Sequence, residues 1–302
     1  MAKQLYGLIG FPVKHSLSAY MHNAAFKACG IEAEYNLFEV KPFELKKFLL
    51  EPQAEFTDTA GNKIKAGDIT GFNITIPHKV FAKNILEDKF APAQTAQQGL
   101  IALAGAVNTA LRQGNKIHYR NTDAMGFTIS LKEDLKFEPQ GKNILVLGCG
   151  GAGRAVVAGL AQEEQKVKKI YVYENDEITA HVLQGHFERL KELIVIIGKD
   201  NLESAAQDSQ LVVNATPLGM RANDPSPIEH EWLHKNLSVY DVIYHQETQL
   251  VKDARVLGLN VCGGLGMLLY QGVLAWEFWT GKKAPVVVMR QALNDALNKE
   301  VK

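Results

Sequence analysis

The fold is decided by the stretch Ile144-Leu145-Val146-Leu147-Gly148-Cys149-Gly150-Gly151-Ala152-Gly153-Arg154. Its apolar start is typical of a buried strand, and the residues from Arg154 to Ala161 have the pattern of a helix. The G-x-G-x-x-G spacing between strand and helix is typical of dinucleotide-binding folds, because glycines permit a tight turn and a helix N-terminus attracts the pyrophosphate. We therefore predict that the nucleotide is bound at Gly148, Gly150, Gly151, Ala152 and Gly153.

An acidic residue follows the next predicted strand. The strand Ile170 to Tyr173 ends at Glu174, 21 positions after Gly153. Folds of this kind place an acid near this point, where it accepts hydrogen bonds from the adenosine ribose. We predict that Glu174 and the adjacent Asn175 contact the ribose, although a glutamate at a strand end is also an ordinary solvated residue.

Working outward, apolar runs continue to alternate with segments of helical period. Runs at Leu193 to Ile197, Leu211 to Asn214 and Val239 to Tyr244 predict further buried strands. This α/β pattern predicts a Rossmann-type doubly wound parallel sheet in a dinucleotide-binding domain at residues 123–264.

A second α/β unit precedes this domain. Its predicted strands are Leu5 to Phe11, Tyr35 to Val40 and Ile69 to Ile76, followed by a hairpin of Leu103 to Leu111 with Lys116 to Tyr119. The polar segment Glu51 to Gly67 is predicted to be a surface loop or an insertion. The tail from Leu265 has a helical pattern and no strand of its own, so it is expected to return to the first unit. We predict a substrate-binding, catalytic domain formed by residues 1–122 with 265–302.

Composition excludes several classes of protein. The chain has 302 residues, 46% of them hydrophobic, and its 33 Lys and Arg balance 33 Asp and Glu. No net positive field would attract nucleic acid or an anionic membrane, and no stretch approaches the roughly 20 apolar residues of a membrane span. Three widely spaced cysteines suggest neither a disulfide framework nor a zinc site, so no metal is predicted. We expect a cytoplasmic protein, monomer or homodimer, with a small-molecule substrate.

Three polar segments of the first domain are candidates for a site for a polyhydroxylated acid. In the first, Ser16 and Ser18 stand at the start of a helical pattern and are placed to donate to a carboxylate; the alternative is that they are helix N-caps. The second runs Asn73-Ile74-Thr75-Ile76-Pro77-His78-Lys79. The third combines Ala106-Val107-Asn108-Thr109 with Asn121-Thr122-Asp123, which the predicted hairpin joins.

These segments, taken in order, resemble shikimate dehydrogenases over essentially the whole chain. The matching stretches are Ser16-Leu17-Ser18, Asn73 to Lys79, Gly105 to Thr109, Asn121 to Asp123, the glycine loop, Asn214-Ala215-Thr216-Pro217-Leu218-Gly219-Met220, Asp241-Val242-Ile243-Tyr244, and Gly264-Leu265-Gly266-Met267-Leu268 followed by Gln271. The resemblance implies a reversible, NAD(P)-dependent reduction of 3-dehydroshikimate to shikimate, in the chorismate pathway of aromatic amino acid biosynthesis.

The resemblance also implies residue roles. Ser16 and Ser18 would bind the substrate carboxylate, and Lys79 and Asp123 would be the catalytic pair. The remaining implied contacts are Thr75, Lys79, Asn108, Asp123 and Gln271 with the ring hydroxyls, Tyr244 with the pocket, and Thr216, Met220 and Gly264 with the nicotinamide.

The chemistry of Lys79 and Asp123 can be argued from their side chains. Hydride transfer to a nicotinamide requires the hydroxyl proton to leave, and the reverse reaction requires an acid to protonate the forming alkoxide. A nearby ionised Asp123 favours the ammonium form of Lys79, whereas burial disfavours it. We interpret Lys79 as the proton donor and Asp123 as the group that orients it.

Some positions depart from the family, and they leave alternatives open. Gln246 stands where relatives usually have proline, Ala124 where they have glycine, and the segment 51–67 matches no family feature. At the strand end, Glu174-Asn175-Asp176 replaces an Asn-Arg-Thr triplet whose arginine faces the 2′-phosphate of NADP, so NAD is the expected cofactor, with NADP also allowed. The rival functions are a quinate/shikimate dehydrogenase of quinate catabolism and, more remotely, a non-catalytic ligand sensor.

Overall fold

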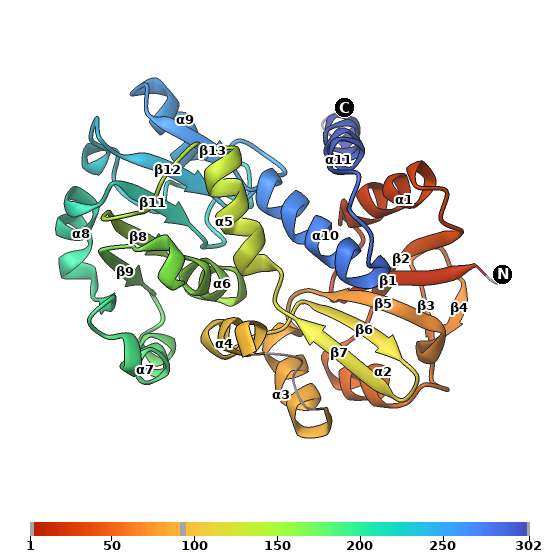
Figure 1. Cartoon of the computed structure of the whole chain (residues 1–302). Helices are drawn as coiled ribbons and strands as arrows, with labels where there is room; N and C mark the ends of the chain where they lie inside the picture. Colours follow the sequence, from red (N-terminus) through yellow and green to blue (C-terminus); the bar gives the residue numbers. More distant parts are fainter. Residues whose placement is uncertain (1–2, 91–94, 301–302) are drawn as a thin grey trace. The chain divides into compact units, whose positions relative to one another are not determined.

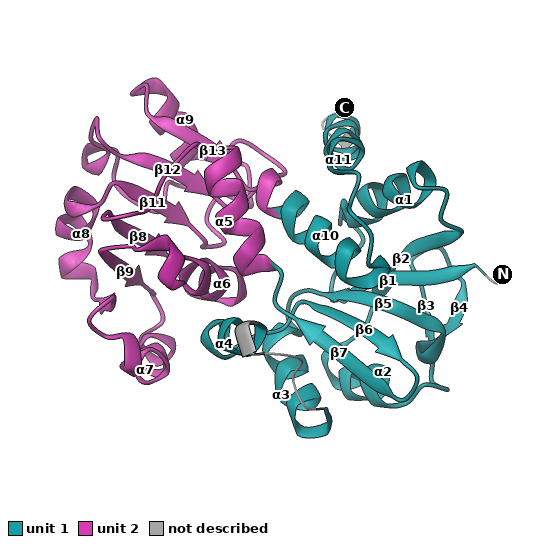
Figure 2. Ribbon diagram, viewed as in Figure 1, with its two compact units in different colours: residues 1–122, 268–302 teal, residues 123–267 magenta. Residues whose placement is uncertain are grey.

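The computed structural model describes residues 3–90 and 95–300 (Figure 1). The chain divides into two compact units, one of residues 1–122 with 268–302 and one of residues 123–267 (Figure 2). Residues 1, 2, 301 and 302, at the ends of the predicted first domain, lie outside the described residues.

Unit 1 is built on a five-stranded sheet of order β2-β1-β5-β6-β7. The first three strands in this order are parallel, while β6 pairs antiparallel with β5 and with β7. Their bounds are Gln4–Gly10 for β1, Ala33–Glu39 for β2, Ile69–Ile74 for β5, Thr109–Gln113 for β6 and Lys116–Arg120 for β7. The parallel pairing of β5 with β1 and the antiparallel pairing with β6 bring Asn73 opposite both Leu8 and Thr109.

The helices of unit 1 cover both faces of this sheet. On one face Tyr6 and Tyr35 pack against Trp279, whose indole nitrogen donates to the Ala110 carbonyl at 2.9 Å. Figure 1 shows α1 beside α11 near the chain's C-terminus. The C-terminal helices therefore return to the first unit, as predicted. The bounds are Ser18–Ala28 for α1, Leu45–Leu50 for α2, Lys79–Lys89 for α3, Thr95–Ala104 for α4, Leu265–Thr280 for α10 and Val286–Glu300 for α11.

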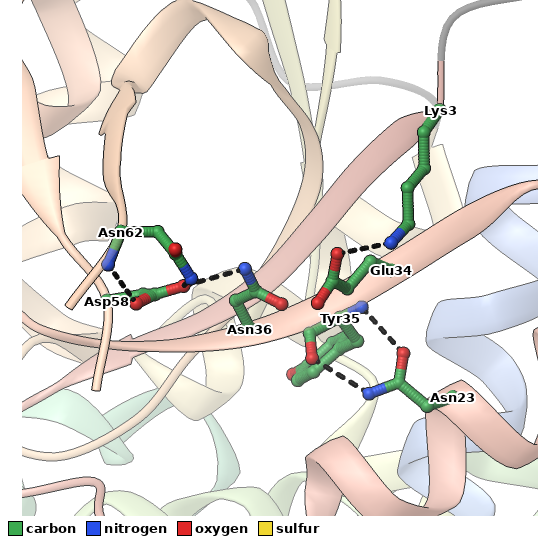
Figure 3. Close-up of polar contacts among 7 residues, drawn as sticks. All are labelled: Lys3, Asn23, Glu34, Tyr35, Asn36, Asp58 and Asn62. Atoms are coloured by element: carbon green, nitrogen blue, oxygen red, sulfur yellow. Dashed lines mark hydrogen bonds and ion pairs between the residues drawn. The ribbon is translucent and has the colours of Figure 1, made fainter. Parts of the chain in front are cut away.

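The segment predicted as a surface loop or an insertion, 51–67, contains a short hairpin that the sequence did not predict. Strands β3 (Glu55–Thr57) and β4 (Lys63–Lys65) pair antiparallel, and Phe56 packs edge-on against Phe48 in the core. The buried Asp58 forms the turn by accepting from the backbone nitrogens of residues 60 and 62 and from the side chains of Asn36 and Asn62 (Figure 3). The Thr59 nitrogen also donates to the Leu37 carbonyl on β2 at 2.9 Å. Three-residue strands are too short to show a period in the sequence.

Unit 2 is a six-stranded, fully parallel sheet of order β10-β9-β8-β11-β12-β13. This is the predicted doubly wound fold, in which the strand order reverses beside β8. The strands are β8 (Asn143–Leu147), β9 (Lys169–Tyr173), β10 (Ile194–Ile197), β11 (Leu211–Asn214), β12 (Ser238–Asp241) and β13 (Asn260–Gly263). The helices are α5 (Asp123–Glu133), α6 (Gly151–Leu160), α7 (Glu177–His186), α8 (Leu202–Asp208) and α9 (Gln249–Val256).

Two predicted boundaries need correction, and one strand was not predicted. The predicted strand Leu103 to Leu111 begins only at Thr109, because α4 continues to Ala104. The next residue, Gly105, has φ +62° and does not continue the helix. The predicted strand Val239 to Tyr244 ends at Asp241, whose side chain accepts from the nitrogen of Ile243 and turns the chain. Strand β13 was not predicted, since it is short and polar at its start. Among the described residues, none of the helices has the length and apolar character that crossing a bilayer requires.

Candidate active site

The two serines predicted to bind a carboxylate lie at the start of α1. The Ser16 hydroxyl donates to Ser18 Oγ at 3.1 Å, and Ser16 Oγ accepts from the backbone nitrogen of Ser18 at 3.3 Å. Ser18 is buried and Ser16 half-buried. Leu17 occupies the N-cap position of α1 and makes no side-chain cap. Ser16 Oγ satisfies a backbone nitrogen of the first turn, as an N-capping serine does, and both hydroxyls also form a local hydrogen-bonded pair. The N-cap and the carboxylate interpretations of these serines therefore both stand.

A buried cluster of amides and hydroxyls lies where β5, β6 and the segment after β7 meet. Asn73 donates to Thr109 Oγ1 at 3.0 Å, and Asn108 donates to Thr122 Oγ1 at 2.9 Å. The backbone nitrogen of Thr122 in turn donates to Asn108 Oδ1 at 2.7 Å. Because each of these side chains is less than 4% exposed and hydrogen-bonded, the predicted position of Asn108 is tightly fixed.

Thr75 and Lys79 are held by backbone contacts on either side of a proline. The Thr75 nitrogen donates to the Ile9 carbonyl at 2.9 Å, and the Lys79 carbonyl accepts from the Val107 nitrogen at 3.1 Å. Lys79 is half-buried at the first position of α3. The second bond ties the start of α3 to the residue before Asn108, so the lysine and the amide cluster are anchored to one another through the main chain.

His78 lies in the second polar segment, but the sequence assigned it no role of its own. It is fully buried, and its Nε2 lies 2.6 Å from the Val40 carbonyl. Burial lowers the pKa of this imidazole, partly opposed by the hydrogen bond to Val40. The contact with Val40 therefore fixes the position of His78, which directly precedes Lys79. The signal available in the sequence was a histidine between a proline and a lysine, which carries no information about burial.

The other predicted substrate contacts are distributed over both units. Gln271 is buried on α10, and its amide donates to the Leu268 carbonyl at 2.8 Å. Asp123 is buried at the first position of α5, directly after Thr122 in the chain. Tyr244 is half-buried beyond the end of β12, with its ring edge-on to His245 at 5.9 Å between centroids.

The glycine loop has the backbone geometry that its sequence predicts. Gly148 has φ +79°, and its nitrogen donates to the Tyr173 carbonyl at 2.8 Å. A Cβ at Gly153 would lie 2.1 Å from the Gly148 carbonyl oxygen, so α6 is seated directly on the turn. A Cβ at Gly150 would meet no atom within 4 Å, which leaves the loop open to a ligand at this point. Gly151 and Ala152 form the first turn of α6, where backbone nitrogens favour an anion.

Glu174 is fixed against this loop. Its Oε2 accepts from the Cys149 nitrogen at 2.8 Å, and its Oε1 accepts from the Asp176 nitrogen at 3.2 Å. The adjacent Asn175 is exposed and accepts from the Tyr173 hydroxyl at 3.1 Å. The carboxylate is therefore held beside the glycine turn, and its remaining lone pairs are available to further donors.

The loop after β11, which is predicted to contact the nicotinamide, is held by polar groups around a buried carboxylate. Asp241 is fully buried and accepts from Thr248 Oγ1 at 2.7 Å, Asn214 Nδ2 at 3.1 Å and the Ile243 nitrogen at 3.0 Å. Burial raises the pKa of this carboxyl, and the three donors act in the opposite direction. Asn214 Oδ1 then accepts from the Thr216 hydroxyl at 2.7 Å. We refer to Asn214, Thr216, Asp241 and Thr248 as the carboxylate cluster.

The carboxylate cluster fixes only part of the predicted nicotinamide contacts. Thr216 is half-buried and bound to the cluster, whereas Met220 is 53% exposed. Gly264 is buried, and a Cβ there would lie 2.0 Å from the Val242 carbonyl oxygen. Gln246, which stands where relatives usually have proline, donates to the Gly219 carbonyl and so holds the same loop by a side-chain bond.

Two family models match segments of the chain. Residues 8–110 match the model of the shikimate dehydrogenase substrate binding domain, and residues 264–293 match that of the shikimate 5′-dehydrogenase C-terminal domain. The NADP(+) shikimate dehydrogenase of Methanopyrus kandleri is 37% identical over 302 residues, covering 96% of this chain and 95% of the relative.

Solved structures give the same result. The shikimate dehydrogenase of Aquifex aeolicus has a TM-score of 0.81 and 33% identity, covering 97% of this chain and 98% of its own. The quinate dehydrogenase of Corynebacterium glutamicum, solved in complex with NAD, also has a TM-score of 0.81, with 27% identity and coverage of 97% and 99%. The length and identity of these matches, together with the site described above, show that the chain belongs to the shikimate dehydrogenase family.

Proposed function

We propose that this protein catalyses the reversible, NAD(P)-dependent reduction of 3-dehydroshikimate to shikimate. The observation that carries the proposal is the fixed cluster of amides and hydroxyls around Asn108, anchored through the main chain to Lys79, in a chain that matches shikimate dehydrogenases along 96% of its length. Neutral donors and acceptors of this kind suit a ring that carries several hydroxyls.

Each residue has a role in this proposal. Ser16 and Ser18 bind the substrate carboxylate. The ring hydroxyls are bound by Thr75, Asn108 and Gln271 together with Lys79 and Asp123, and Tyr244 completes the pocket. A bound nicotinamide supplies or accepts the hydride. Lys79 holds the proton that passes to the forming alkoxide, and Asp123 favours the ammonium form of that lysine.

The first experiment is a spectrophotometric assay of the purified protein with shikimate and with quinate, each with NAD and with NADP. Oxidation of shikimate supports the proposal. The likeness to the quinate dehydrogenase of Corynebacterium glutamicum favours quinate oxidation as the second candidate function. A kcat/KM higher for quinate than for shikimate would replace the first proposal by this one. Reduction of neither cofactor with either substrate would refute both.

The proton-transfer role predicts a large effect on turnover. Lys79→Ala should lower kcat at least about 100-fold, the range expected when a general acid is lost, while KM for shikimate changes much less. Asp123→Ala should lower kcat by a similar factor. Lys83→Ala is the matched control, since this lysine lies one turn further along α3 and pairs with Glu87. Near wild-type kcat in Lys79→Ala would exclude this lysine as the proton donor.

We further propose that NAD is used at least as well as NADP, although the named relatives are NADP(+) enzymes. Hydrogen bonds from the nitrogens of Cys149 and Asp176 hold the Glu174 carboxylate beside the glycine turn. At about 4 Å, a carboxylate repels a phosphate charge by roughly 4 kcal/mol at an effective dielectric of 20, and by less where water screens it. The same carboxylate accepts hydrogen bonds from both ribose hydroxyls of NAD.

The cofactor proposal is tested by kcat/KM for NAD and NADP at saturating shikimate. The variant Glu174→Gln removes the charge and keeps an oxygen for the Cys149 nitrogen, so its NADP/NAD ratio should rise by about 10-fold or more, the equivalent of about 1.4 kcal/mol. Glu174→Ala removes both the charge and the acceptor. A strong NADP preference in the wild type would refute this cofactor assignment and would point to Arg154 or Lys199 as a phosphate contact.

The three cysteines support a cytoplasmic site for this activity. Cys29 is exposed, Cys149 buried and Cys262 half-buried, and all three are free thiols. Free thiols are typical of a reducing compartment. We propose a cytoplasmic enzyme that is a monomer or a homodimer, which light scattering of the purified protein would determine.

A further inference from the structure

The second half of the loop after β11 is held by side chains to which the resemblance assigns no role. The carboxylate cluster reaches only as far as Leu218, whose carbonyl accepts from Asn214 Nδ2 at 3.1 Å. The next three residues are Gly219, Met220 and Arg221. We call these three residues the loop tip.

The loop after β11 lies against the glycine loop. Strand β11 pairs in parallel with β8, so the carboxyl ends of the two strands meet at the same edge of the sheet. A Cβ at Gly148 would lie 2.9 Å from Thr216 Cγ2, so the two loops are in contact. Doubly wound sheets bind their ligands at this edge, where the strand order reverses, and here the reversal lies beside β8. The two loops therefore border the position at which such folds bind a dinucleotide.

Asp224 closes the loop tip on itself. Its Oδ2 accepts from the backbone nitrogens of Gly219 and Arg221, each at 3.0 Å, and its own nitrogen donates to the Arg221 carbonyl at 3.0 Å. One carboxylate oxygen thus fixes both ends of the loop tip. Met220 lies between them and is 53% exposed, so its side chain is available to a ligand while its backbone is held.

His245 and Gln246 hold the loop tip from the segment after β12, the strand that pairs with β11. Gln246 Nε2 donates to the Gly219 carbonyl, and His245 Nε2 lies 3.2 Å from the Met220 carbonyl. Because a carbonyl can only accept, both side chains direct an N–H at it. The proline that relatives usually have in place of Gln246 has no such donor.

We propose that Asp224 and Gln246 are positioning residues for the nicotinamide half of the cofactor. They fix the loop tip before the cofactor binds, so binding does not have to order it, and Met220 is already in place for the ring. Both residues act through the backbone of the loop tip and take no part in proton or hydride transfer. The inference rests on the proposed function in one respect, since it requires a nicotinamide cofactor.

The test compares the dissociation constants of NAD and of ADP-ribose for the whole protein by titration calorimetry. ADP-ribose has the adenosine and the pyrophosphate of NAD and lacks the nicotinamide ring. Gln246→Ala should raise the Kd of NAD about 3- to 10-fold, the equivalent of one hydrogen bond, and leave that of ADP-ribose within about twofold. If the wild type binds NADP more tightly, NADP and 2′-phospho-ADP-ribose take the places of this pair.

Asp224 offers a second variant with a conservative partner. Asp224→Ala should also raise the Kd of NAD about 3- to 10-fold and spare ADP-ribose. Asp224→Asn keeps an oxygen for the nitrogens of Gly219 and Arg221, so it should recover most of the lost affinity. The matched control is Gln249→Ala, since this glutamine donates to Asp253 Oδ1 at 2.7 Å within α9, away from the loop tip. It should change neither dissociation constant.

The possible outcomes separate the two proposals. Equal rises for NAD and ADP-ribose would show a general weakening of unit 2 and would overturn the positioning role. An unchanged Kd of NAD in one of the alanine variants would remove that residue from the role. A wild type that binds NAD and oxidises no shikimate would overturn the proposed function alone, because the titrations still decide the role of the loop tip. A wild type that binds neither NAD nor NADP would overturn both.

Discussion

Two buried polar sets, the amide cluster of unit 1 (Asn73, Asn108, Thr109 and Thr122) and the carboxylate cluster of unit 2, differ in their chemistry. Both are buried sets of polar side chains that fix segments at predicted binding sites. The amide cluster consists only of neutral hydroxyls and amides, whereas the carboxylate cluster is centred on Asp241, which is fully buried with three donors around it. A neutral set tolerates the loss of one member, whereas a set built around a charge depends on that charge.

The strongest way to test this difference is to delete the charge. Asp241→Ala leaves the Asn214 amide, the Thr248 hydroxyl and the Ile243 nitrogen without their acceptor, and should lower the free energy of unfolding by about 3 to 5 kcal/mol. Asn73→Ala, the corresponding deletion in the amide cluster, should lower the free energy of unfolding by only about 2 kcal/mol. Urea unfolding measures both. Equal losses in the free energy of unfolding would show that the charge of Asp241 contributes no more to stability than a neutral side chain does.

A smaller effect should appear as a difference in the response of the two units to acid. His22 is buried beneath Tyr35 with no hydrogen-bond partner on either nitrogen, and burial lowers its pKa to about 3. Between pH 6.5 and about 3 the unfolded chain binds this proton and the folded unit does not, so stability falls as the pH falls, by about 2 kcal/mol at pH 5. The raised pKa of Asp241 has the opposite effect on stability. The folded state binds this proton more readily than the unfolded chain, so acid stabilises unit 2 at this position.

Hydrogen exchange at pH 7 and pH 5, corrected for the intrinsic exchange rates, measures this difference. Strands β1, β2 and β5 of unit 1 should lose more protection on acidification than β8, β11 and β12 of unit 2. In His22→Phe, which keeps an aromatic ring on Tyr35, the loss in unit 1 should shrink to the part contributed by His78, whose pKa is also lowered. Parallel losses in both units, unchanged in the variant, would contradict the assignment to His22.

The two regions also differ in how far the sequence predicts them. The glycine loop was predictable because its signal is local. Gly148 and Gly153 are five positions apart and lie against each other, so the short motif itself indicates the turn. Tyr35 and Asn73 are 38 positions apart, and nothing near either residue indicates that they meet. Asp241 was included only as part of a matching motif, since its burial follows from β12 lying inside the sheet. Strand β13 and the hairpin of β3 and β4 were missed because each is too short to show a period.

That hairpin has a consequence for the protein in a crowded cell. Strand β2 is the outermost strand of its sheet, and a bare outer strand offers its backbone to strands of other molecules. The turn after β3 lies along it, with Asp58 bridging Phe38 and the Thr59 nitrogen bound to the Leu37 carbonyl. Part of the open edge is thus already paired with the chain's own backbone, so the segment 51–67 leaves less of β2 available to a strand of another molecule.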